Sequence, residues 1–263
     1  MRVHDEKSWA KIYEVPGIRN AAFILRDHNH ESVHVVNKEE CVRRTLPAST
    51  FKIFNSLVAL ETGIAPNDDL VIPWDGINRE IPAWNKDLTL REAFRESAVW
   101  YYQELARRIG QPTLQRYLDT ANYGNKVISK VDTFWLDGSL QISPDEQIGF
   151  IRQLYFNDLP FAERSQRIVK SMMLREDSSR YKLYYKTGWG KAGAATDVLW
   201  VVGFIERIEK VKEMEGSMNN SDIRAYPYFF AQRFEIASGD TSRDWAAFRI
   251  ELLKKVLREA GAY

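Results

Sequence analysis

Several residue types are scarce in this 263-residue chain, and each scarcity excludes a kind of site. The single cysteine, Cys41, rules out an internal disulfide. Only four histidines occur, and all lie near the N-terminus: His4, His28, His30 and His34. A zinc site or a Ser-His-Asp triad would have to be built from this one segment, so no metal site is expected. Exposed polar histidines are the simpler interpretation.

An excess of charge and long apolar runs are also missing. Lys and Arg number 37 against 36 Asp and Glu, a formal net charge of +1, so no nucleic-acid partner is expected. No apolar run approaches the length of a membrane span, so no membrane partner is expected either. The N-terminal segment MRVHDEKSWAKIYE lacks the apolar core of a signal peptide. We therefore expect either a cytoplasmic protein or an exported one whose signal has been removed.

The order of the predicted elements indicates the fold class. Residues 21–37 predict two strands joined by a polar turn, and aromatic, β-branched stretches in the last third predict more strands. Helical patterns fill residues 66–180, including a well-capped helix that begins at Ser143. This order predicts an α+β fold, in which an antiparallel β-sheet is flanked by helices and an all-helical subdomain is inserted. We expect one domain, with residues 1–65 and 181–263 forming the sheet subdomain and 66–180 the helical one.

The segment PASTFKIFNSLVALETG, residues 47–63, predicts a core helix that carries two reactive groups. Lys52 falls in its first turn, where the helix dipole disfavours a cation. Ser49 lies three positions earlier, so its hydroxyl and the amine share one face, which is made of small residues. The Ser-x-x-Lys spacing also occurs at Ser8 and Ser179, but only the copy at Ser49 opens an apolar helix.

Two interpretations of this pair remain open from the local pattern. In the simpler one, Ser49 is a helix N-cap and Lys52 is a surface lysine with its stem along apolar neighbours. In the other, Ser49 is a nucleophile and Lys52 is the base that removes its proton. A lysine is normally protonated, so it serves as a base only if burial keeps it neutral or if it is modified.

The stretch GWGKAG, residues 188–193, matches the G-x-G-x-x-G pattern of dinucleotide-binding proteins. That site needs a helix directly afterwards, so that the helix N-terminus faces the pyrophosphate. Another strand pattern follows instead. We therefore predict a hairpin turn here and no nucleotide cofactor.

Four further short stretches follow the Ser49–Lys52 pair in a recognisable order. They are SAV at Ser97–Val99, YGN at Tyr123–Asn125, a loop tryptophan at Trp135, and KTG at Lys186–Gly188. Together with S-x-x-K, this order resembles that of the class D, oxacillinase-type, serine β-lactamases. The phrases LPASTFKI, ALETG and DLTLREA also look like that family, and the resemblance spans about residues 20–258.

The resemblance implies a serine β-lactamase and a role for each catalytic residue. Ser49 would attack the lactam carbonyl and form an acyl-enzyme. Lys52 would take up CO2 as N6-carboxylysine and act as the general base, with no other cofactor. Trp135 would donate its indole N–H to this carbamate. Ser97 would relay a proton to the departing lactam nitrogen, supported by Lys186.

The resemblance also implies which groups hold the β-lactam. The main-chain N–H groups of the nucleophile and of Trp189 would form the oxyanion hole. The substrate carboxylate would be bound by Lys186, Thr187 and Arg249. In the alternative, Arg249 is a charge on the helix surface and Arg243 takes its place. The other predicted substrate-binding residues are Val99, Trp100, Tyr123, Leu136 and Gly188.

Two of these positions carry further expectations. Val99 would keep the carbamate pocket apolar, and Leu136 would gate the deacylating water. Trp100 stands where many relatives carry proline, so which penicillins, cephalosporins or carbapenems fit stays open.

Three functions are compatible with the resemblance. A hydrolase clears its acyl-enzyme, whereas a β-lactam sensor domain or a penicillin-binding transpeptidase stays acylated. Sensors carry an amide residue where Val99 stands, and transpeptidases lack the loop pattern around Trp135, so hydrolysis is expected. The expected partner is a small-molecule β-lactam, and the expected state is a monomer or homodimer. The family implies a periplasmic or secreted protein.

Overall fold

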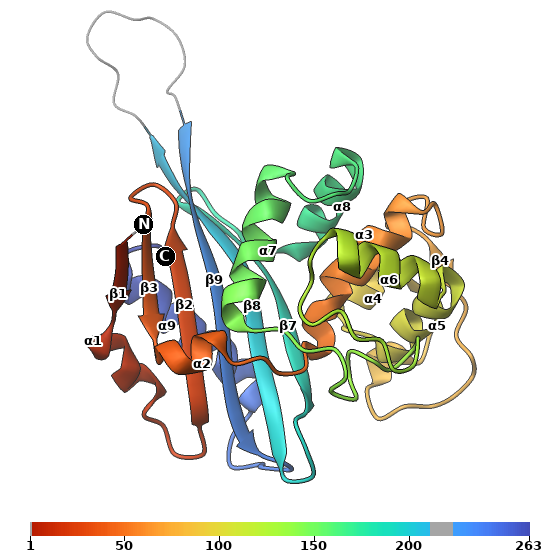
Figure 1. The fold of residues 1–263 in the computed structure, drawn as a ribbon, viewed down its shortest axis with the longest axis horizontal. Coiled ribbons are helices and arrows are strands. Elements are labelled where there is room, and N and C mark those ends of the chain that lie inside the picture. The colour runs from red at the N-terminus through yellow and green to blue at the C-terminus, as the bar shows by residue number, and fades with distance from the viewer. Residues whose placement is uncertain (1, 211–222) are drawn as a thin grey trace, which may run out of the picture.

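A computed structural model of the protein describes residues 2–210 and 223–263. Figure 1 shows a twisted β-sheet with helices on both faces and a group of helices beside one of its edges. The predicted α+β class is confirmed. No helix in the described ranges is long and apolar enough to cross a membrane.

Within the described residues, the main sheet has seven strands in the order β1-β3-β2-β9-β8-β7-β6. Their bounds are β1 Arg2–Asp5, β2 Arg19–Asp27, β3 Ser32–Val36, β6 Leu174–Asp177, β7 Tyr181–Lys191, β8 Thr196–Lys210 and β9 Ile223–Ala237. β1 lies parallel to β3, and the other neighbouring strands are antiparallel. A separate pair consists of β4 Val71–Ile72 and β5 Leu88–Thr89.

The helices cover the sheet and form the region beside it. Their bounds are α1 Lys7–Ala10, α2 Lys38–Val42, α3 Lys52–Glu61, α4 Leu90–Arg95, α5 Val99–Ile109, α6 Gln111–Thr120, α7 Pro144–Phe156, α8 Glu163–Met173 and α9 Trp245–Glu259. Short 3-10 turns are η1 Lys11–Tyr13, η2 Ala48–Phe51 and η3 Pro82–Trp84. The predicted start of α7 is confirmed, because Ser143 and Glu146 form a reciprocal capping box.

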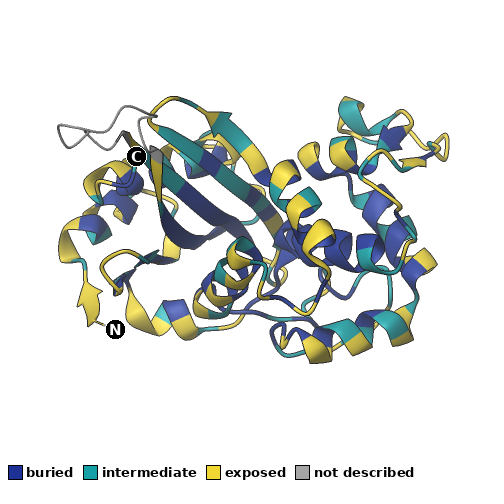
Figure 2. Cartoon of the chain, turned by 90° about the horizontal axis from the view of Figure 1, so that it is seen from above, coloured by how far each residue is buried: buried dark blue, intermediate teal, exposed yellow. Residues whose placement is uncertain are grey.

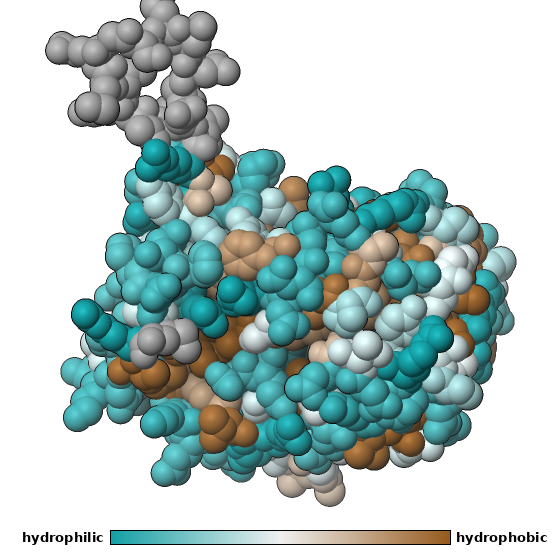
Figure 3. Space-filling view, turned by 45° about the horizontal axis from the view of Figure 1, so that its top comes forward, coloured by the Kyte–Doolittle hydropathy of each residue, from teal (hydrophilic) through white to brown (hydrophobic). Residues whose placement is uncertain are grey.

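The sheet separates two hydrophobic cores. Along β8, Trp200 and Val202 belong to the core shared with α3, α5 and α7, whereas Leu199 and Val201 belong to the core shared with α9. Side chains alternate between the faces of a strand, so a continuous apolar run is expected where both faces are covered. Figure 2 shows this pattern as buried strands enclosed by helices with exposed outer sides. Hydrophilic residues cover most of the face in Figure 3.

Two elements of the 66–180 segment belong to the sheet layer. The strand β6 forms the sheet edge beside β7, and the helix α7 packs across β2, β8 and β9. The pattern of residues 66–180 predicted neither contact. The division of the chain into two subdomains at residues 65 and 181 remains a proposal.

Two glycines let β7 approach the turn that carries Ser49. The predicted hairpin is present, but its turn begins only after Lys191 and not at Gly188. β7 continues to Lys191 and pairs with β8 in an antiparallel register, so Gly188 and Gly190 lie within the strand. A Cβ added at Gly188 would lie 3.0 Å from the carbonyl oxygen of Pro47, and one at Gly190 would lie 2.8 Å from Leu46 Cδ1. The glycines of the G-x-G match therefore serve close packing.

We expect Gly188→Ala to lower the free energy of unfolding by about 1–3 kcal/mol, because the new methyl group presses on a backbone carbonyl. Gly149→Ala is the matched control: position 149 lies in α7 with nothing within 4 Å of the added Cβ. At position 149, replacing glycine by alanine should raise the free energy of unfolding by about 0.5–1 kcal/mol, because alanine favours the helix. Urea unfolding measures both, and equal effects at the two positions would contradict the packing role.

Candidate active site

The first feature of the site is the pair formed by Ser49 on η2 and Lys52 at the start of α3. The Lys52 Nζ donates a hydrogen bond to Ser49 Oγ at 2.8 Å. Lys52 is fully buried, and Ser49 is 7% exposed. Burial lowers the pKa of Lys52 to about 7, because the charged amine is desolvated. The surface-lysine interpretation is therefore wrong, and no side chain caps α3, whose N-cap is Phe51.

The turn that presents Ser49 is fixed by hydrogen bonds on both sides. The Thr50 hydroxyl donates to the carbonyl of Pro47 at 2.7 Å, and Gln147 of α7 donates to the same hydroxyl at 2.8 Å. The N–H of Ala48 donates to the carbonyl of Trp135 at 3.1 Å. Ala48 has a φ of 48°, which is uncommon for a residue other than glycine and needs such support.

The second feature is the pair formed by Ser97 and Lys186. The Lys186 Nζ donates to Ser97 Oγ at 2.9 Å and to the carbonyl of Thr187 at 3.0 Å. Burial lowers the pKa of Lys186 well below its usual value, and the nearby positive charge of Lys52 lowers it further. The two serine–lysine pairs therefore lie close enough for the charge of Lys52 to act on Lys186, and their catalytic roles stay predictions.

Trp135 carries an unsatisfied donor and contacts the turn that holds Ser49. Its side chain is fully buried, and its ring stacks on Phe51, the residue before Lys52, with the centroids 5.3 Å apart. Among the described residues, its indole N–H has no hydrogen-bond partner. A buried donor without a partner carries a desolvation cost, which an added acceptor would remove. On the other side, the ring of Tyr102 lies 5.1 Å from the Lys52 Nζ.

Arg249 reaches the site from α9 and is not a surface charge. It is buried, its Nη1 donates to the carbonyl of Gly188 at 2.7 Å, and burial lowers its pKa to about 10. Its guanidinium lies 5.8 Å from the centroid of Trp189, a ring that is 39% exposed. The alternative residue, Arg243, instead contacts the carbonyl of Pro16 and the ring of Trp245. The structure therefore favours Arg249 over Arg243.

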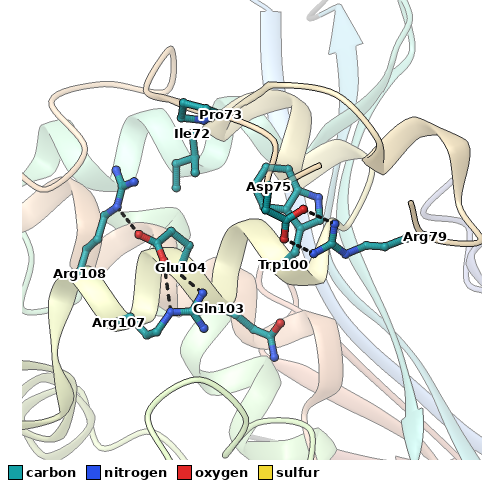
Figure 4. Close-up of a pocket in the computed structure, with 9 residues that line it drawn as sticks. All are labelled: Ile72, Pro73, Asp75, Arg79, Trp100, Gln103, Glu104, Arg107 and Arg108. Carbon is teal, nitrogen blue, oxygen red and sulfur yellow. Dashed lines mark hydrogen bonds and ion pairs between the residues drawn. The ribbon is translucent and has the colours of Figure 1, made fainter. Parts of the chain in front are cut away.

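Two predicted substrate-binding residues are packed inside the protein. Tyr123 is 2% exposed, and its ring contacts Phe51 and Phe54. Trp100 is 5% exposed, and its ring lines a pocket of about 300 Å³ on α5 together with Arg79 (Figure 4). Their roles in substrate binding stay predictions: the Tyr123 ring is enclosed by aromatic neighbours, and Trp100 faces the pocket on α5. Val99, Leu136 and Thr187 are half-buried.

The sequence patterns did not indicate two residues that support the site. Gln147 bonds to Thr50, and Asp197 accepts a hydrogen bond from the Trp189 indole at 2.9 Å. The predicted hairpin could have revealed Asp197, because its register places this residue diagonally across from Trp189. No spacing rule would have found Gln147. Among the described residues, no three His, Cys, Asp or Glu side chains gather as a metal site would require.

Comparison with known proteins agrees with this geometry. Residues 21–221 match the family of penicillin binding protein transpeptidase domains. The chain is 38% identical to beta-lactamase OXA-48 of Klebsiella pneumoniae over 237 residues, which cover 90% of this chain and 82% of that protein. The chain belongs to the class D serine β-lactamases.

This class D β-lactamase is similar to solved structures of two kinds, an enzyme and a receptor domain. One is the class D beta-lactamase of Sebaldella termitidis, with a TM-score of 0.87, 36% identity and coverage of 100% of both chains. The other is the C-terminal domain of the Bacillus licheniformis BlaR penicillin-receptor, with a TM-score of 0.87, 30% identity and coverage of 100% of this chain and 98% of that one. The fold is thus shared by enzymes and by a receptor.

The burial of Lys52 predicts a pH-dependent stability in CO2-free buffer. Below pH 7 the amine is protonated in the folded and unfolded states, so the folded enzyme bears the full cost of the buried charge. Between about 7 and 10.5 only the unfolded state is protonated, so the free energy of unfolding rises with pH. We expect the free energy of unfolding of the wild type, minus that of Lys52→Met, to show this rise when both are measured by urea unfolding. A difference that stays constant over this range would contradict a depressed pKa.

Proposed function

We propose that this class D β-lactamase hydrolyses the lactam amide of penicillin-type antibiotics through an acyl-enzyme on Ser49, with a carboxylated Lys52 as the general base. The observation that carries the proposal is the 2.8 Å contact between Ser49 Oγ and a buried amine with a pKa of about 7. We also propose a periplasmic or secreted location, which the family resemblance implies.

The neutral state of Lys52 supports both its reaction with CO2 and its role as a base. An unprotonated Nζ can attack the carbon of CO2, with loss of a proton to solvent, and burial favours that unprotonated form. The carbamate would supply an anionic oxygen base for both half-reactions. The unpaired, buried indole N–H of Trp135 fits such an anion, because it would gain the acceptor that it lacks among the described residues.

In acylation, the Ser49 hydroxyl loses its proton towards Lys52 as its Oγ bonds to the lactam carbonyl carbon. The lactam C–N bond then breaks, and Ser97, hydrogen-bonded to Lys186, delivers a proton to the departing nitrogen. The main-chain N–H groups of Ser49 and Trp189 would stabilise the oxyanion. The close approach of β7 to the Pro47 carbonyl supports that placement.

The remaining predicted residues would hold the substrate and admit water. Arg249, Lys186 and Thr187 would bind the substrate carboxylate, and the buried guanidinium of Arg249 keeps its positive charge at neutral pH, because its pKa remains about 10. Val99 and Leu136 would shield the base and gate the deacylating water. Their half-buried state is compatible with that role.

A β-lactam receptor that stays acylated is the second candidate, favoured by the likeness to the BlaR domain. Against it stands Val99, an apolar residue at the first position of α5, where the family resemblance implies an amide residue in sensors. An apolar side chain there would leave Lys52 shielded from a competing hydrogen-bond donor. This supports turnover by the enzyme.

The deciding experiment follows ring absorbance and intact mass together after mixing the protein with a small excess of a simple penicillin. We expect all substrate to disappear and the protein to return to its free mass. Ser49→Ala should form no adduct, and Lys52→Ala should acylate slowly and lose turnover. A lasting one-to-one adduct on the wild type would indicate a receptor, and no adduct with no substrate loss would refute the proposal.

We expect activity lost after acid treatment to return on adding bicarbonate, and ¹³C-bicarbonate to give a carbamate NMR signal. Trp135→Phe should need more bicarbonate for half-maximal activity, because the carbamate would lose a donor. Trp245→Phe is the control, since this indole N–H is also buried and unpaired among the described residues but lies in the other core. An unchanged bicarbonate requirement in Trp135→Phe would contradict the assignment of Trp135.

A further inference from the structure

Two indole groups connect the loop before β5 to the corner that carries Ser97. The Trp84 Nε1, at the end of η3, donates to the carbonyl of Glu96 at 2.9 Å. The Trp100 Nε1, in the first turn of α5, donates to the carbonyl of Trp84 at 3.0 Å. The two bonds therefore act in series, from α5 to η3 and from η3 to the residue before Ser97.

The position of the Glu96 carbonyl gives this connection a direct effect on Ser97. The Glu96 C=O and the Ser97 N–H belong to one peptide plane. The orientation of this plane about the N–Cα bond of Ser97 defines the φ angle of Ser97. That angle is 60°, in the left-handed region that costs energy for a residue with a side chain. The plane after Ser97 is held by the N–H of Ala98, which donates to the carbonyl of Ala93 at 2.9 Å. The plane before it is held at both ends: the Ser97 N–H donates to the carbonyl of Phe94 at 3.3 Å, and the Glu96 carbonyl accepts from Trp84.

The Trp100 side chain is placed to hold Trp84 rather than a substrate. It is buried, and the guanidinium of Arg79 lies 5.4 Å from its ring centroid. Figure 4 shows Arg79 and its partner Asp75 beside this indole, at one end of the pocket on α5. The backbone N–H of Arg79 donates a hydrogen bond to the side-chain oxygen of Asn85 at 2.8 Å, and Asn85 directly follows η3. The ring of Trp100 thus packs against the same loop that its N–H anchors.

We propose that Trp84 and Trp100 are positioning residues for proton transfer by Ser97. Their serial hydrogen bonds hold the peptide plane that sets the φ angle of Ser97, and so aim its hydroxyl at Lys186 Nζ, 2.9 Å away. The proposal rests on the proposed function, in which Ser97 protonates the lactam nitrogen. It goes further by assigning the control of that geometry to the indole pair.

A role in aiming Ser97 predicts a selective kinetic effect. Protonation of the lactam nitrogen belongs to acylation, whereas hydrolysis of the ester on Ser49 needs the base at Lys52. Loss of either indole N–H should therefore slow acylation at saturating penicillin by about three- to tenfold, the usual effect of one hydrogen bond. The deacylation rate constant should change by less than about twofold. A general loss of stability would not separate the two steps.

The test measures acylation and deacylation by stopped-flow and intact mass in Trp84→Phe, Trp100→Phe and the control Trp74→Phe. Trp74 also donates its indole N–H within the same loop, to the carbonyl of Ile77 at 3.0 Å, but not to the chain next to Ser97. We expect slow acylation in the first two variants and a normal rate in the control. Because the two bonds act in series, the double variant should be no slower than Trp84→Phe alone.

The outcomes separate this inference from the proposed function. If the wild type forms no acyl-enzyme, the proposed function itself fails. If the wild type turns over normally and all three single variants acylate at its rate, only the indole proposal is overturned. Equal slowing by Trp74→Phe, or additive slowing in the double variant, would show a general loosening of the loop and would also overturn it. If Trp84→Phe does not fold, Trp100→Phe against Trp74→Phe decides alone.

Discussion

The burial of a lysine amine against Ser49 is the constraint on which the rest of the site depends. Lys52 is fully buried and Lys186 almost so, and among the described residues neither has an ion-pair partner. An ammonium group without a counterion in a protein interior is costly, and a second positive charge nearby adds to that cost. Both amines are therefore driven towards the neutral form. The chemistry proposed for Ser49 needs that form, so the energetic cost of burial and the proposed function would have one origin.

The scaffold holds strained backbone on both sides of this pair. Ala48, next to Ser49, has a φ of 48°, and Ser97 has a φ of 60°. Such conformations persist only where the surroundings over-determine them. The carbonyl of Trp135 accepts from Ala48, and Gly188 lets β7 lie against the same turn. Rigid elements from distant parts of the chain thus meet at two short, strained turns.

Sequence motifs indicated the two serine–lysine pairs more clearly than they indicated the directions of single side chains. Ser49 pairs with Lys52, and Ser97 pairs with Lys186 from the middle of β7, so the structure brings together serines and lysines that the motifs singled out separately. The burial of Trp100 was not apparent from its motif, because neighbouring helical residues point about 100° apart, so the residue after Val99 turns away from the face that Val99 occupies. The burial of Tyr123 was not apparent either, because a residue in a loop gives no sign of the direction of its side chain.

The sequence patterns did not predict the strands β1 and β6, and the reason is the same for both. Each is a short polar segment that forms a strand only by pairing with a distant or neighbouring strand of the sheet. The strand β1 is exposed along its length and exists through parallel pairing with β3. The strand β6 is no more apolar and pairs with β7 at the sheet edge. Neither has the alternating apolar pattern that identifies a strand from its own residues. The α7 helix, by contrast, was found from its cap, but its contact with the sheet depends on which neighbours cover its apolar side.

The two serine–lysine pairs resemble one another in composition but differ in how their backbones are held. Ser49 sits on a turn supported by main-chain bonds and by Gln147 of α7 through Thr50. Ser97 lies in a corner whose preceding peptide plane is held by a main-chain bond to Phe94 and by an indole from a separate loop. In the proposed mechanism, Ser49 must stay fixed through both half-reactions, whereas Ser97 acts in only one of them. A bond from a loop can therefore tune acylation without disturbing the group that carries the acyl chain. In this fold, the strained backbone at Ser97 is stabilised in part by Trp84, a residue outside the proposed reacting set.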